Sequence, residues 1–209
     1  MKSILTIVVL LIMVTNSFAQ ENKKAKDLEG IAVGEMAPLF TAVDAGNNLF
    51  SLEDEIQHGP VVVIFYRGFW CPVCNKHLST LQDSLQMITD EGARVIAISP
   101  EKPEYLDKMA EKTEARFTLL YDEDYRISDA YDVTFKPGSS KLMVYNMALG
   151  AKLKETHSDD SQRLPIPATF IINQNGKIIW RQFDPDYKNR SSVKDILNAL
   201  QHDSAFTQP

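Results

Sequence analysis

The clearest pattern along the chain is an alternation of short apolar runs with stretches in which apolar residues recur every three or four positions. Residues 61–66 are continuously apolar and rich in β-branched side chains, which predicts a central strand that is buried on both faces. Apolar residues then recur at helical spacing over 78–88, which predicts one amphipathic helix. The strand therefore belongs to a sheet with layers on both sides.

The remaining pattern extends this alternation in both directions. Apolar runs on either side of Asn- and Gly-rich turns predict β-hairpins, and strands and helices alternate between them, which favours parallel pairing through crossover connections. We expect an α/β fold, a central mixed sheet flanked by helices, with an N-terminal β-hairpin. The expected elements are hairpins at 40–52 and 168–183, strands at 94–98 and 117–121, helices at 103–112 and 127–131, and a last helix capped by Ser191 or Ser192.

Three segments divide the chain of 209 residues. Residues 1–19 combine a basic start, a short apolar stretch and a small-x-small end, which is typical of a signal peptide; the stretch is shorter than the ~20 apolar residues that span a membrane. Residues 20–34 are polar and predict a loosely ordered leader. One domain is expected over 35–209, with an irregular excursion at 135–164 that shapes access to the site.

The charge of the chain excludes some classes of partner. The formal net charge is −6, and removal of the signal peptide with its single lysine makes it −7. No basic run predicts nucleic acid binding or stable association with a membrane after cleavage. The signal peptide predicts a periplasmic or secreted protein, and outside the cytosol a pair of cysteines can be oxidised.

Cys71 and Cys74 are the two cysteines of the chain, and a short turn separates them from the central strand. Pro72 suits the first position of a helix, where its missing N–H is no loss, so Cys71 is expected at the N-cap. A thiolate there faces unpaired N–H groups and the positive end of the helix dipole, which lower its pKa. We therefore expect Cys71 to be the nucleophile and Cys74, within the first helical turn, to be the resolving thiol.

Non-catalytic roles for the cysteine pair are less well supported. A passive disulfide across so short a loop adds little stability, and two buried thiols paired by coincidence leave their place between strand and helix unexplained. A zinc site needs two further ligands, yet the histidines include no ligand-spaced pair, so no metal is expected. His77 is the nearest base in sequence, although histidines on solvated helix faces are commoner than catalytic ones. Phe69 and Trp70 either cover the dithiol as a docking surface or pack in the core.

The sequence from Phe65 to Cys74 resembles the alkyl hydroperoxide reductase/thiol-specific antioxidant (AhpC/TSA) group, in a peroxiredoxin-like branch with an Arg-Gly-x-Trp-Cys-Pro-x-Cys signature. Ala-Pro-x-Phe at 37–40, Pro-Ala-Thr-Phe-x-Ile at 167–172 and Asp-Pro-Asp-Tyr at 184–187 extend the resemblance to roughly residues 34–201. It implies a thioredoxin-like fold with a peroxiredoxin-type β-α insertion. It also matches Pro167 to the cis-proline that faces the dithiol in thioredoxin-like proteins.

Two positions depart from the pattern of that family. Typical peroxiredoxins carry Thr or Ser three residues before the reactive cysteine and an Arg near the later strand, where they bind and polarise the peroxide; here Gly68 and Pro167 occupy those places. Arg67 has two interpretations. Beside Cys71 it would favour the thiolate and hydrogen-bond a peroxide oxygen, whereas at the strand end it would form a surface ion pair.

Three functions follow from these residues, and none of them requires a cofactor. The first is a thiol peroxidase that reduces hydroperoxides and is recycled by a thioredoxin-like electron donor; the resemblance favours it. The second is an exported thiol–disulfide oxidoreductase that acts on protein disulfides, which the departures at Gly68 and Pro167 favour. The third, a non-catalytic thioredoxin-fold binding module, is disfavoured by the intact Trp-Cys-Pro-x-Cys sequence.

Overall fold

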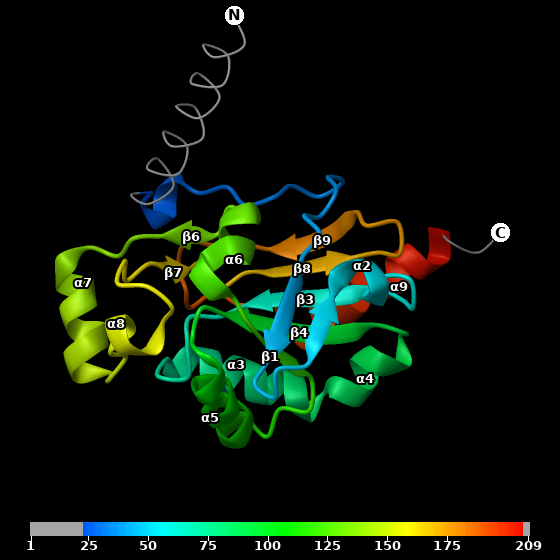
Figure 1. The fold of residues 1–209 in the computed structure, drawn as a ribbon. Helices are drawn as coiled ribbons and strands as arrows, with labels where there is room; N and C mark the ends of the chain where they lie inside the picture. Colours follow the sequence, from blue (N-terminus) through cyan, green and yellow to red (C-terminus); the bar gives the residue numbers. More distant parts are fainter. Residues whose placement is uncertain (1–22, 207–209) are drawn as a thin grey trace, which may run out of the picture.

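A seven-stranded mixed sheet forms the centre of the computed structural model, which describes residues 23–206 (Figure 1). The strand order is β2-β1-β5-β4-β3-β8-β9; β4 pairs in parallel with β3 and β5, and the other neighbours are antiparallel. The predicted fold class is confirmed, while the signal peptide lies outside the described residues. The strands are β1 (Thr41–Asp44), β2 (Leu49–Ser51), β3 (Val61–Phe65), β4 (Arg94–Ser99), β5 (Thr118–Tyr121), β8 (Thr169–Ile172) and β9 (Ile178–Gln182), with β6 (Thr134–Phe135) and β7 (Leu164–Pro165) as a separate pair.

The central strand β3 separates two hydrophobic cores. Successive side chains of a strand point to opposite faces of the sheet. Val62 and Ile64 accordingly belong to one core, and Val61, Val63 and Phe65 to the other. All five are at most 1% exposed, so the uninterrupted apolar run identified a strand that is buried on both faces.

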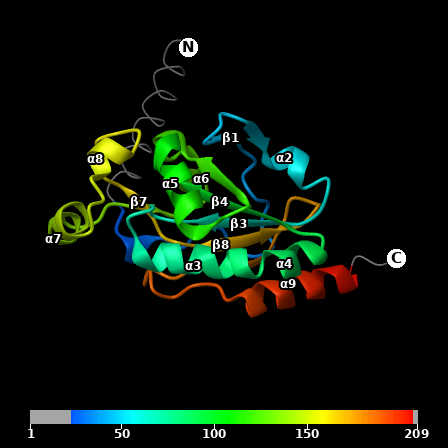
Figure 2. The same cartoon turned by 90° about the horizontal axis from the view of Figure 1, so that it is seen from below.

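Helices cover both faces of the sheet. Residues of α3 (Pro72–Asp83), α4 (Leu85–Asp90), α5 (Pro103–Thr113) and α9 (Val193–Phe206) join the first core, and Figure 2 shows α3, α4 and α9 side by side. The second core is closed by α2 (Leu52–Glu55) and α6 (Arg126–Ala130), the latter preceded by the 3₁₀ turn η2 (Glu123–Tyr125). The dithiol thus begins a helix of the first layer.

Two helix predictions are refined by the structure. The helix expected over 78–88 is interrupted at Ser84, whose φ and ψ of −110° and 10° are not helical. The last helix begins after Ser192, whose Oγ accepts a hydrogen bond of 3.1 Å from the Asp195 N–H. Of the two predicted caps, Ser192 is therefore the N-cap.

We expected the excursion at 135–164 to be irregular, but it is helical. It contains α7 (Ser139–Met143), the π-helical turn η3 (Val144–Ala148) and α8 (Leu153–Thr156), and it stands beside the sheet in Figure 1. Each piece is about one turn long, which is too short for an apolar repeat to show in the sequence. Tyr145 and Leu153 are buried, so this segment packs against the domain.

The described part of the leader is also ordered by contacts with the domain. It forms the 3₁₀ turn η1 (Ala25–Asp27), Leu28 is 4% exposed, and Lys23 pairs with Asp132. The Arg181 guanidinium donates to the backbone carbonyls of Glu29 and Ile31. Residues 23–34 therefore follow the domain surface rather than forming a loose leader. Over 23–206, no helix has the length and apolarity that a membrane crossing requires.

Candidate active site

The dithiol lies at the carboxyl end of β3, as the sequence predicted. Cys71 is the N-cap of α3, Pro72 is its first residue, and the Cys71 sulfur accepts a hydrogen bond of 3.4 Å from the Cys74 backbone N–H. Both thiols are free, their sulfurs are 2.7 Å apart, and both residues are 0% exposed. The site is a reduced pair that is sealed from solvent.

Arg67 is directed at the dithiol and is not part of a surface ion pair. Its side chain is buried, and one guanidinium nitrogen donates to the Cys71 sulfur at 3.3 Å. Another donates to the Tyr145 hydroxyl at 3.1 Å, and the guanidinium lies 4.0 Å from the Tyr187 ring centre. The cationic interpretation of Arg67 is therefore the one that the geometry supports.

A second arginine reaches the other sulfur. An Arg190 nitrogen lies 3.5 Å from the Cys74 sulfur, and the Arg190 Nε donates to the Tyr187 carbonyl at 2.6 Å. Sequence reasoning missed Arg190, although it follows the 184–187 segment that carried part of the family resemblance. Each sulfur thus has its own guanidinium donor.

Ionisation of the two thiols is a property of the pair. Although burial opposes it, the hydrogen bond with Cys71 and the charges of Arg190 and Arg67 hold the pKa of Cys74 well below its ordinary value. The hydrogen bond with Cys74, and then burial, raise the pKa of Cys71. We expected the lowered pKa at Cys71 itself; instead the pair loses its first proton readily and retains the second, because two thiolates in contact repel each other.

The turn between β3 and the dithiol is held by a carboxyl group that the sequence did not suggest. Glu101 is 0% exposed, and its Oε2 accepts a hydrogen bond of 2.7 Å from the Phe69 N–H. Burial is the main cause that raises the pKa of Glu101 to about 8, and the nearby charge of Cys74 adds to it. Glu101 is therefore mostly protonated at neutral pH.

Glu101 also explains why position 68 is a glycine. A Cβ atom on Gly68 would lie 2.5 Å from Glu101 Oε1 and 2.5 Å from Trp70 Nε1. The φ angle of Gly68 is 149°, a backbone conformation that other residues rarely adopt. The space that a Thr or Ser side chain would need is therefore filled by the carboxyl group of Glu101.

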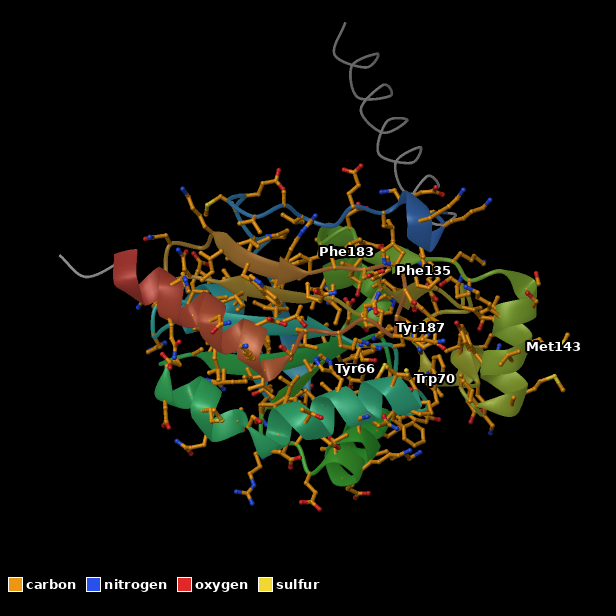
Figure 3. All side chains as sticks on the ribbon, turned by 180° about the vertical axis from the view of Figure 1, so that it is seen from behind. Tyr66, Trp70, Phe135, Met143, Phe183 and Tyr187 are labelled. Atoms are coloured by element: carbon orange, nitrogen blue, oxygen red, sulfur yellow. The ribbon has the colours of Figure 1, made fainter. Side chains whose placement is uncertain are left out.

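The two aromatic residues before the dithiol differ in their surroundings. Trp70, which Figure 3 labels, is 5% exposed and packs against Tyr145, with ring centres 5.2 Å apart, in the same core cluster as the two cysteines. Phe69 is half-buried and lies within 6 Å of the ammonium groups of Lys108 and Lys112. The packing interpretation therefore holds for Trp70.

Two other residues that the sequence singled out have structural roles. His77 is buried, its Nε2 lies 3.1 Å from both the carbonyl and the hydroxyl of Ser191, and burial lowers its pKa to about 4. The expectation of a cis bond before Pro167 is wrong, because the described chain has only trans peptide bonds. The trans form is the intrinsically preferred one. The residue after Pro167, Ala168, accepts a hydrogen bond from the Phe65 N–H in β3.

The site residues come from distant parts of the chain. Tyr145 is supplied by the helical excursion, Tyr187 and Arg190 by the segment before α9, and Glu101 by the connection between β4 and α5. No local spacing connects them with the cysteines, so only the resemblance at 184–187 signalled part of this set. Within residues 23–206, no group of three or more His, Cys, Asp and Glu side chains is arranged to hold a metal ion.

Comparisons with known sequences agree with this geometry. Residues 33–181 match the family model described as AhpC/TSA family. Peroxiredoxin Bcp of Escherichia coli (strain K12) is 34% identical over 171 residues, which are 82% of this chain and 96% of the relative. The chloroplastic peroxiredoxin Q of Gentiana triflora is 34% identical over 172 residues, which are 81% of this chain and 68% of the relative.

Solved structures support the same assignment at the level of the fold. Peroxidoxin BcpB of Mycobacterium tuberculosis superposes with a TM-score of 0.63 at 19% identity, over 82% of this chain and 97% of that one. The bacterioferritin comigratory protein of Xanthomonas campestris gives 0.62 at 16% identity, over 84% and 99%. The central sheet thus has the thioredoxin-like arrangement that peroxiredoxins share, and the chain belongs to the AhpC/TSA family.

Proposed function

We propose that this protein is a thiol-dependent hydroperoxide reductase in which Cys71 attacks the peroxide and Cys74 resolves the oxidised product. The observation that carries the proposal is a buried pair of free thiols in which Arg67 donates a hydrogen bond to the Cys71 sulfur. A guanidinium in that position stabilises negative charge on the attacking sulfur and on the oxygen that leaves.

The reaction has two steps on the enzyme. The pair reacts in the form that keeps its one remaining proton on Cys74: the Cys71 thiolate attacks one peroxide oxygen, so an S–O bond forms and the O–O bond breaks, and the departing alkoxide takes from solvent the proton that the pair had released, to become an alcohol. The Cys74 sulfur then attacks the sulfenic sulfur of Cys71; the S–S bond forms, and hydroxide leaves with the Cys74 proton as water. The 2.7 Å between the sulfurs means that the second step requires little rearrangement.

Two features bear on the choice between peroxides and protein disulfides as substrates. Gly68 supplies no hydroxyl group to a bound peroxide, which favours the disulfide oxidoreductase. Full burial of Cys71 favours a small substrate, because a protein disulfide has to touch the attacking sulfur. The bacterioferritin comigratory protein of Xanthomonas campestris, whose fold resembles that of this chain, has alkyl peroxide reduction activity. We therefore place peroxide reduction first.

The proposal includes the recycling partner and the compartment. A thioredoxin-like dithiol would reduce the Cys71–Cys74 disulfide by exchange, with its own two thiols becoming a disulfide. The apolar segment in 1–19 supports export to the periplasm or secretion. N-terminal sequencing of the protein from a producing cell tests export; a mature chain that still begins at Met1 would contradict it.

One set of assays tests the function. Peroxide consumption and reduction of insulin disulfides are measured for the wild type, Cys71→Ser and Cys74→Ser with a common dithiol reductant. We expect Cys71→Ser to lose peroxide consumption and Cys74→Ser to accumulate a sulfenic acid that dimedone traps. Disulfide reduction without peroxide consumption would select the alternative function, and full activity of Cys71→Ser would refute both.

A further inference from the structure

A groove beside the active site combines an apolar floor with a basic rim. It has a volume of about 570 Å³ and lies where the leader turn η1, the β6–α7 connection and the segment before α9 meet. Phe135 and Tyr187, which Figure 3 labels on the side of the molecule that carries α7, contribute aromatic rings to it. The lining residues used below are Lys24, Lys26, Phe135, Lys136, Lys141 and Tyr187.

The rim carries unusual charge for an acidic protein. Four exposed lysines line the groove, whereas the chain as a whole has a formal net charge of −6. None of the four takes part in an ion pair among the described residues, whose salt bridges use Lys23, Lys152 and three arginines instead. Asp186 is the one carboxylate of the lining, and its Oδ1 accepts from the Lys188 N–H. The groove is therefore a local positive field that attracts anions.

The groove is linked to the reacting sulfur through two side chains. Tyr187 lines the groove, its ring lies 4.0 Å from the Arg67 guanidinium, and Arg67 donates to the Cys71 sulfur at 3.3 Å. Three other cavities of the described chain, at Arg94, at Trp180 and at Phe40, are lined by residues that do not contact the dithiol. A ligand in the lysine-rimmed groove is thus next to the reaction centre.

We propose that this groove binds the carboxylate end of an organic hydroperoxide, with the peroxide group directed past Tyr187 toward Arg67 and Cys71. The inference rests on the proposed function and specifies its substrate class. The volume is that of a small-molecule site, and a concave apolar floor with a few charged groups suits an amphipathic ligand better than a protein surface. The reaction leaves the carboxylate untouched, so the product alcohol binds to the same lysines.

A matched pair of substrates isolates the role of charge. The probes are cumene hydroperoxide with a para-carboxylate, its methyl ester, and hydrogen peroxide. The groove variant is Lys136→Gln/Lys141→Gln, and the control is Lys154→Gln/Lys194→Gln, which removes two exposed lysines outside the groove. We expect the wild type and the control to prefer the acid over the ester in kcat/KM, and this preference to fall as ionic strength rises.

In the groove variant, the acid-to-ester ratio is expected to fall about five- to tenfold, because two exposed and solvent-screened ion pairs with the carboxylate are lost, while hydrogen peroxide turnover is unchanged. An unchanged ratio with normal hydrogen peroxide turnover overturns the groove proposal alone. A loss confined to assays in which a protein reductant is limiting also overturns it, and assigns the groove to that protein. Absence of turnover with all three peroxides in the wild type refutes the proposed function.

Binding provides a readout that does not depend on turnover. Calorimetry with the para-carboxylate of the product alcohol is expected to show weaker binding to the groove variant than to the control, by the same five- to tenfold. Equal affinities of the two variants contradict the proposal, whatever the activity of the enzyme.

Discussion

At the scale of single residues, the carboxyl group of Glu101 occupies the place of the hydroxyl group that typical peroxiredoxins carry at the position of Gly68. Glu101 fills the space that a side chain at Gly68 would need, and it holds the turn through the Phe69 N–H. A protonated carboxyl group is compatible with the negative charge of the dithiol, whereas a carboxylate is not. The protonation state of Glu101 should therefore be visible in the stability of the protein.

Glu101→Gln is expected to remove a pH-dependent component of stability. The folded-state pKa of Glu101, about 8, lies above its ordinary value of 4.5, so its contribution is fully present below pH 4.5 and is lost as the pH rises toward 8. Urea unfolding of the wild type at pH 5 and pH 8 should show this loss, on the order of a few kcal/mol. Glu101→Gln should lose much less, and the exposed Glu104→Gln should behave as the wild type. Parallel curves for wild type and Glu101→Gln would contradict the assignment.

The residues that the sequence identified are those with local partners. Cys71, Pro72 and Cys74 are positioned by one strand end and one helix start, and both can be recognised from neighbouring residues. Arg190 and Glu101 meet the site only through the packing of the whole sheet, so no spacing in the sequence connects them with it. The pKa of Cys71 was misjudged for a related reason, because helix-dipole reasoning treats the thiol alone and the sulfur of Cys74 dominates its surroundings.

At the scale of elements, we infer that the helical excursion covers the dithiol. Its π-helical turn η3 carries Tyr145, whose ring packs on Trp70 and whose hydroxyl accepts from Arg67. Strands such as β3 and β4 were predicted closely, because a short, continuous apolar run bounded by turn residues indicates a buried strand. The helices of the excursion were not predicted, because α7, η3 and α8 are too short for their buried positions to form a repeat.

Tyr145→Ala is expected to expose the dithiol. Loss of the ring removes the packing over Trp70, so iodoacetamide should alkylate the reduced protein about tenfold faster, which corresponds to about 1.4 kcal/mol in the free energy of opening. Tyr145→Phe keeps the ring and should alkylate close to the wild-type rate. Met147→Ala, on the same turn but 79% exposed, is the control. Mass spectrometry at fixed pH follows the reaction, and equal rates for all four proteins would show that the turn is not a cover.

At the scale of the whole molecule, buried acids and buried histidines have opposite effects on the pH dependence of stability. Burial raises the pKa of Asp122 to about 6 and of Glu101 to about 8, and it lowers those of His77 to about 4 and His157 to about 3. Around pH 5–6 the two buried acids hold protons in the folded chain, whereas the two histidines hold protons in the unfolded chain. The folded and unfolded chains therefore bind nearly the same number of protons at these groups, and the free energy of unfolding changes little with pH there.

The free energy of unfolding is therefore expected to reach a broad maximum at about pH 6. As the pH falls below 6.5, the stability that the neutral histidines contribute is lost toward their folded pKa values; as it rises, the contribution of Glu101 is lost toward pH 8. Replacement of His157 by Asn should flatten the acid side and leave the alkaline side unchanged. Denaturant titrations from pH 4 to pH 9 measure both limbs, and an acid limb of wild-type steepness in His157→Asn would contradict this account.

The contacts of the two guanidinium groups join residues far apart in the sequence, and this has a consequence for folding. Tyr145 is 78 positions from Arg67, and Arg190 is 116 positions from Cys74. Before these segments meet, a newly made chain carries two ordinary thiols beside each other, with neither cationic donors nor a cover. We therefore expect peroxide turnover to appear during refolding only when the last segment docks, so that its time course would follow completion of the native structure.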